Sequence, residues 1–152
     1  MWSWRSASCT DWTASARGAL AVVILLDQFS RNMFRGTPRA FAQDPLALAI
    51  CNSAVDTGMD EELSPLERSF LYLPMEHSED LAVQERSVRC FGALLERCAA
   101  ADRDLFAEFL DYAEQHRRIV ARFGRFPHRN AVLGRPSTPE ELRFLEAPGS
   151  SF

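Results

Sequence analysis

Apolar residues recur at the spacing of one helix face along nearly the whole chain. No stretch shows the strict alternation of polar and apolar residues that a half-buried strand requires. The connections between the apolar stripes are short, which favours antiparallel neighbours. We therefore expect an all-α protein, built as a helical bundle of stacked antiparallel helix pairs.

Capping and breaking residues set the limits of the expected helices. The apolar run LAVVILL predicts a central buried helix over residues 14–33, and we expect the amphipathic helix over residues 102–123 to pack beside it. Asp44 and Ser78 are predicted N-caps, and Pro74 is expected to end or kink a helix. The remaining signals are a capping box at Ser64, a closing Gly124 and a second capping box at Thr138 that predicts a last helix to about residue 146.

The length and composition are typical of one globular domain. The 152 residues can bury a core without disulfides or metal ions as staples. We expect a single helical domain over residues 12–147, preceded by an atypical or truncated segment over residues 1–11. The longest apolar run is too short to span a bilayer and the N-terminus lacks the signal-peptide order, so we expect a cytoplasmic protein with no membrane role.

Three segments carry a resemblance to a known family. They are LLDQFSRNMFRGTPRAF (25–41), ERSFLYLPMEHSEDLAVQERSV (67–88) and HRRIVARFGRFPHRNAVLGRPSTPEELRFL (116–145). From Trp12 onward the chain resembles the bacterial domain-of-unknown-function family 924. The resemblance implies a fold similar to tetratricopeptide-type helix stacks and implies no activity. Ser30 stands where that family usually has proline, and the family usually has a further helical segment before the position of Trp12.

The most distinctive stretch is the loop GRFPHRNAVLGR over residues 124–135. It lies within residues 115–139, which hold six arginines and two histidines but no carboxylate. Arginine forks suit phosphates and carboxylates, and the N-terminus of the last helix lies close by in sequence. The sequence therefore predicts an anion site. An alternative is that these arginines bind helix carbonyls and the acidic segment 76–80, and so hold the fold together. The candidate ligand-binding residues are Arg35, Arg125, His128, Arg129 and Arg135.

Candidates for proton transfer come from other parts of the chain. Asp27 follows a buried apolar run and lies four residues before Arg31, so we expect either a buried ion pair or a carboxylate that orients an arginine. His77 lies among carboxylates and could act as a general acid or base, as could His128. His116 is expected to be a hydrogen-bonded core histidine, because it lies on an apolar stripe.

Two classes of function remain open at this stage. The first is a binding module that takes an anionic small molecule or an acidic peptide in an arginine-lined groove. The second is a small enzyme that uses a histidine and carboxylate pair on a phosphate- or carboxylate-bearing substrate. The net charge of −4 makes nucleic acid an unlikely partner. No compact metal-ligand spacing is present, so a metal would need separate helices, for example through Glu76, His77 and His116; we expect no metal and no cofactor. The oligomeric state is left open.

Overall fold

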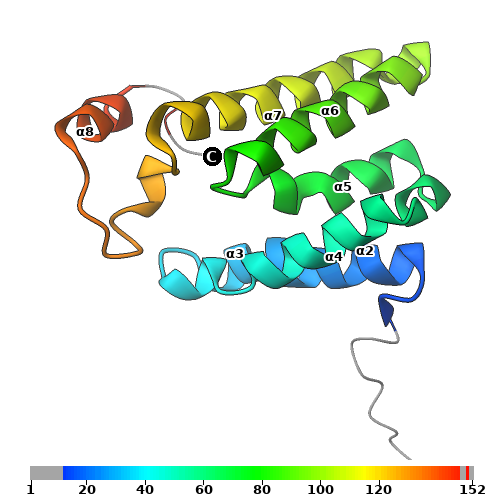
Figure 1. The fold of residues 1–152 in the computed structure, drawn as a ribbon, viewed down its shortest axis with the longest axis horizontal. Coiled ribbons are helices and arrows are strands. Elements are labelled where there is room, and N and C mark those ends of the chain that lie inside the picture. The colour runs from blue at the N-terminus through cyan, green and yellow to red at the C-terminus, as the bar shows by residue number, and fades with distance from the viewer. Residues whose placement is uncertain (1–11, 148–149, 151–152) are drawn as a thin grey trace, which may run out of the picture.

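The computed structural model describes residues 12–147 and 150, and these residues form an all-α fold with no strand (Figure 1). The predicted fold class is confirmed, while the segment over residues 1–11 lies outside the described residues. The helical elements are α2 (Ala16–Ile24), η1 (Leu25–Phe29), α3 (Ser30–Met33), η2 (Pro38–Phe41), α4 (Asp44–Asp56), η3 (Met59–Glu62), α5 (Pro65–Glu76), α6 (Leu81–Arg97), η4 (Ala100–Asp102), α7 (Arg103–Phe123), η5 (Pro127–Arg129) and α8 (Pro139–Leu145).

The helices stack in chain order. The rod formed by α2, η1 and α3 packs on α4, then α5 crosses between this layer and the pair formed by α6 and α7 (Figure 1). The expectation that the helix over residues 102–123 lies beside the one over residues 14–33 is wrong. The apolar face of α7 is covered by α6, its neighbour across a short connection, and consecutive elements usually pack together in this way.

One main cluster of buried side chains joins α2, α4, α5, α6 and α7. Tyr72 of α5 and Phe91 of α6 meet edge to face near its centre. A second, smaller cluster contains Ile119, Val120 and Phe126, with the rings of Phe123 and Phe144 packed against it. This second cluster fixes the loop after α7 and the short helix α8 to the end of the stack.

Most predicted helix limits are confirmed. Both capping boxes form, and Gly124 ends α7 with φ 68°, a left-handed conformation that favours glycine. Pro74 does not end its helix, because it lies inside α5, which continues to Glu76. The predicted cap at Ser78 is wrong: the N-cap of α6 is Asp80, whose carboxylate accepts from two backbone N–H groups.

The rod that begins with α2 contains a five-residue π-helix, η1. This widened turn changes which side of the rod each residue faces. Asp27 and Ser30 are buried, whereas Leu25 and Phe29 are half exposed. Widened turns of this kind are frequent at functional sites, and here the turn directs a carboxylate into the interior.

Candidate functional site

Asp27 is the centre of a buried polar cluster. Its side chain is fully buried, and Oδ1 lies 3.2 Å from Nη2 of Arg31 and 2.8 Å from Nδ1 of His77. Oδ2 accepts a hydrogen bond of 2.6 Å from the amide of Gln28. Burial opposes the charged form, but these partners outweigh it and lower the pKa of Asp27 to about 2. The predicted ion pair with Arg31 is confirmed, and the carboxylate stays charged at neutral pH.

His77 is held in place by the junction between α5 and α6. It is the C-cap residue of α5, and the buried side chain of Gln84 donates hydrogen bonds of 2.6 Å to the carbonyls of Glu76 and Ser78 on either side of it. Burial lowers the pKa of His77, although Asp27 acts in the opposite direction. Since Asp27 accepts at Nδ1, the other ring nitrogen is the one left to accept a proton.

Asp44 joins the cluster from α4. It is the first residue of that helix and not its N-cap, which is Gln43, so the predicted cap is wrong. Oδ2 of Asp44 lies 2.9 Å from Nη2 of Arg31 and 3.6 Å from Nη1 of Arg129. Burial raises the pKa of the Asp44 carboxyl group. Two guanidiniums therefore share one carboxylate oxygen.

Arg129 is a buried cation with few polar partners. Its guanidinium carbon lies 4.8 Å from the ring centre of Phe41 and 4.5 Å from that of Phe126. Its Nε is buried and has no hydrogen-bond acceptor among the described residues. Burial and the nearby charge of Arg31 lower the pKa of Arg129 to about 10, so it remains a cation at neutral pH.

A cavity of about 350 Å³ opens beside this cluster. It is lined by Arg31, Arg35, Gly36, Ala40, Phe41 and His128. Arg35 is exposed, and its guanidinium makes a hydrogen bond of 3.3 Å to Asn32. Burial, together with the charges of Arg129 and Arg31, lowers the pKa of His128 to about 4, so its ring is neutral at pH 7. The structure thus brings together two of the predicted ligand residues, Arg35 and His128. Arg129 is not among the lining residues, but its guanidinium packs on the ring of Phe41, which is.

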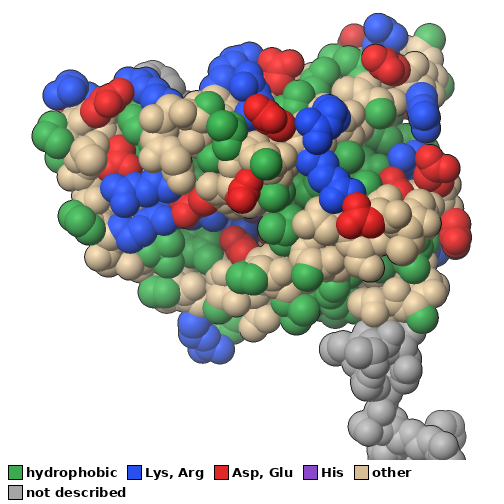
Figure 2. All heavy atoms as spheres, viewed as in Figure 1, with side chains coloured by type: hydrophobic (Ala, Val, Ile, Leu, Met, Phe, Trp, Pro, Cys, Tyr) green, Lys and Arg blue, Asp and Glu red, His purple; other side chains and the backbone are tan. Residues whose placement is uncertain are grey.

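The other two predicted ligand residues are engaged elsewhere. Arg125 donates to both carboxylate oxygens of Glu141 and to the carbonyl of Pro136, and Arg135 donates to both oxygens of Glu79. Figure 2 shows carboxylates directly beside the arginines of this region. For these two arginines the structural alternative holds. The acidic segment 76–80 supplies Glu79 to Arg135, and none of its residues is among those that line the cavity.

His116 and Glu76 form a separate pair behind His77. Nδ1 of His116 lies 2.8 Å from the carbonyl oxygen of Tyr112 and 3.4 Å from Oε1 of Glu76. Burial lowers the pKa of His116 to about 4 and raises that of Glu76 to about 8. His116 is the buried, hydrogen-bonded histidine that its apolar stripe predicts. Among residues 12–147 and 150, no three His, Cys, Asp or Glu side chains are grouped so that they could hold a metal ion.

Sequence reasoning missed two residues of the site. Phe41 lines the cavity and packs against both Arg31 and Arg129, and Asp44 was taken for a cap. The signal for Asp44 was weak, because an acid before proline fits a helix start equally well as a cap or as the first helical residue. An aromatic residue that closely follows three arginines was the available signal for Phe41.

Comparisons place the chain among known proteins. The model of a family described as bacterial protein of unknown function (DUF924) matches residues 3–149. The solved structure of ATU0120, a protein of unknown function from Agrobacterium tumefaciens, has 43% sequence identity and a TM-score of 0.78, and the match covers 91% of this chain and 72% of that one. No curated protein matches the chain. In the described part of the chain, every helix is too short or too polar to cross a membrane.

Proposed function

Since the chain belongs to the bacterial DUF924 family, whose function is unknown, we propose from its own geometry that it is a binding module for a small anionic molecule. The site is the cavity lined by Arg31, Arg35 and His128. One observation carries the proposal: Arg31 and Arg129 pair with the two carboxylates of Asp27 and Asp44, while Arg35, which lines the same cavity, has no carboxylate within ion-pair distance among the described residues. One positive charge is left for an outside anion.

The hydrogen bonds support the same proposal. The guanidinium of Arg31 donates hydrogen bonds to Asp27 and Asp44, and two aromatic rings shield that of Arg129 from solvent. Arg35, with a long bond to Asn32, keeps the most donors for a ligand at the cavity. Arg35 would therefore bind the anion directly. Arg31 and Arg129, which are partly or fully buried, would make the electrostatic potential of the cavity more positive.

The size of the cavity favours a small molecule. Its volume of about 350 Å³ lies within the range of small-molecule pockets, and an acidic peptide would engage it only through a terminal carboxylate. A phosphate or carboxylate group fits the planar fork of Arg35. As part of the proposal, the protein is cytoplasmic and its helices form a tetratricopeptide-like stack. Stacks of this kind present binding grooves.

The proposal is tested by thermal unfolding in sulfate. Sulfate should raise the Tm in a saturable way, because a ligand that binds only the folded state stabilises it. Arg35→Gln should remove most of this rise, and Arg103→Gln, which changes an exposed arginine at the start of α7, should keep it. An equal rise in all three proteins would refute the site.

A second arginine-lined cavity provides a competing position. It has a volume of about 360 Å³ and its lining includes Arg68, Arg86, Arg89 and Arg97. Three of these are already paired, Arg68 with Asp60, Arg86 with Asp56 and Arg97 with Glu61. We therefore expect Arg89→Gln to leave the sulfate response unchanged. Loss of the response in Arg89→Gln, with retention in Arg35→Gln, would move the site to this cavity.

An enzymatic function is the second candidate, and the contact between Asp27 and His77 is the observation that favours it. A carboxylate that orients an imidazole makes its second nitrogen a general base. His77 is not among the residues that line the cavity, which favours binding over catalysis. Release of phosphate from a phosphate monoester by the wild type, lost in His77→Gln while sulfate binding survives, would support the enzyme.

A further inference from the structure

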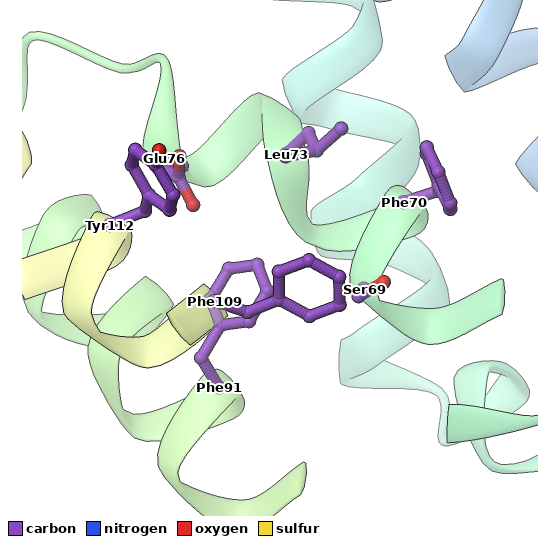
Figure 3. A pocket seen from close by; sticks show the side chains of 7 residues that line it. All are labelled: Ser69, Phe70, Leu73, Glu76, Phe91, Phe109 and Tyr112. Carbon is purple, nitrogen blue, oxygen red and sulfur yellow. The ribbon is translucent and has the colours of Figure 1, made fainter. Parts of the chain in front are cut away.

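A third cavity lies between α5, α6 and α7, and Glu76 is one of its lining residues. Its volume is about 210 Å³, and it is lined by Ser69, Phe70, Leu73, Glu76, Phe91, Phe109 and Tyr112. Figure 3 shows Glu76 and Tyr112 together at one end and Ser69 at the other, with the rings of Phe91 and Phe109 between them. The walls are apolar and aromatic, and Glu76 is the one charged residue among the lining residues that the structure describes.

Among the described residues, no arginine lies within ion-pair distance of the carboxyl group of Glu76. Glu76 is 6% exposed, and the basic side chain within 4 Å of it is that of His116. Because a carbonyl oxygen can only accept, Nδ1 of His116 must carry the proton that it shares with Tyr112. This nitrogen is 2.8 Å from the carbonyl oxygen of Tyr112 and 3.4 Å from Oε1 of Glu76, so the carbonyl is its nearer acceptor. A buried acid thus faces an apolar cavity without a strong partner.

We infer that this cavity binds an organic ammonium ion with a compact apolar body, held by the carboxylate of Glu76. The ammonium group would lie at the end formed by Glu76 and Tyr112, where a carboxylate and an aromatic ring both attract a cation. The apolar body would lie along Phe91 and Phe109. A metal ion is a poor alternative, because no group of three suitable side chains is present among the described residues.

The volume limits the size of the ligand. An engineered cavity of about 150 Å³ lined by apolar side chains holds benzene. A cavity of about 210 Å³ therefore accommodates one phenyl ring and a short aminoalkyl arm. Benzylamine is a suitable probe, and benzyl alcohol has nearly the same shape without the charge.

The two probes and one substitution test the inference by titration calorimetry. The wild type should bind benzylamine at least about tenfold more tightly than benzyl alcohol, because the bond to the amine is charge-assisted. At pH 7 the binding should release a proton, since Glu76 must ionise to pair with the amine. In Glu76→Gln the preference for the amine should vanish, while Glu85→Gln, an exposed control on α6, should keep it.

Two results would overturn the inference. One is equal affinity of the wild type for the amine and the alcohol, which needs no variant and so does not depend on how Glu76→Gln folds. The other is amine binding without proton release that persists in Glu76→Gln. The site itself is refuted if neither probe binds the wild type at millimolar concentration.

Discussion

Nδ1 of His77 lies 2.8 Å from Oδ1 of Asp27, fifty positions away in the sequence. This contact joins the π-helix of the first rod to the end of α5. It also fixes the orientation of the imidazole ring. Because Arg31 binds the same oxygen of Asp27, one buried carboxylate connects a wall of the cavity lined by Arg31, Arg35 and His128 to the junction between α5 and α6.

Removal of the Asp27 carboxylate should destabilise the protein. In Asp27→Ala, Arg31 and His77 lose their common partner, and we expect a cost on the order of 3 kcal/mol in the free energy of unfolding. Urea unfolding measures this change. Asp104→Ala, at an exposed position of α7, should cost far less, and an equal loss in the two variants would contradict the role of Asp27.

The ion pairs of Arg125 and Arg135 should stabilise the fold and should not contribute to sulfate binding. Arg125→Gln and Arg135→Gln should each lower the Tm, because Glu141 and Glu79 are then left without their two-point partners. The dissociation constant for sulfate should stay within about twofold of the wild type, since neither residue lines the cavity. A tenfold weaker affinity for sulfate in either variant would show that the substituted arginine contributes to anion binding.

Stability should depend on pH through Glu76. Its pKa is about 8 in the folded protein, above its ordinary value of 4.5, so between these values the unfolded chain loses a proton that the folded chain keeps. Stability should therefore fall as the pH rises from about 4.5 to about 8. Glu76→Gln should flatten this part of the profile of Tm against pH, and Glu85→Gln should follow the wild type. If the slope is the same in Glu76→Gln as in the wild type, the pH dependence arises from another titratable group.

Sulfate binding should strengthen as the pH falls from 7 towards 4. The pKa of His128 is about 4 without ligand, and a bound anion raises it, so the complex takes up a proton that the free protein does not hold. Sulfate keeps its own charge over this range, so the trend reports on the protein. In His128→Gln the dependence of affinity on pH should be weaker. If affinity depends on pH in His128→Gln as it does in the wild type, His128 does not take part in sulfate binding.

The sequence predicts local features of this fold well. Ser64 and Thr138 start helices, and Gly124 ends one, because each of these signals depends only on neighbouring backbone groups. The ion pair between Asp27 and Arg31 was also predictable, because four residues span one helical turn.

Long-range features of the site were not predictable. The approach of His77 to Asp27 depends on how α5 crosses the first rod, and the π-helix that buries Asp27 has no mark in the sequence. The carboxylates that bind Arg125 and Arg135 belong to other segments of the chain, outside residues 115–139. The excess of cations within those residues therefore suggested more arginines available to a ligand than the fold provides.

The location of a bound anion tests the central claim most directly. Crystals grown or soaked with selenate, a heavier analogue of sulfate, give an anomalous signal at the selenium position. The account predicts a peak in the cavity lined by Arg31, Arg35 and His128, within hydrogen-bond reach of the Arg35 guanidinium. A peak in the Arg86 and Arg89 cavity alone, or no peak at a selenate concentration that raises the Tm, would contradict it.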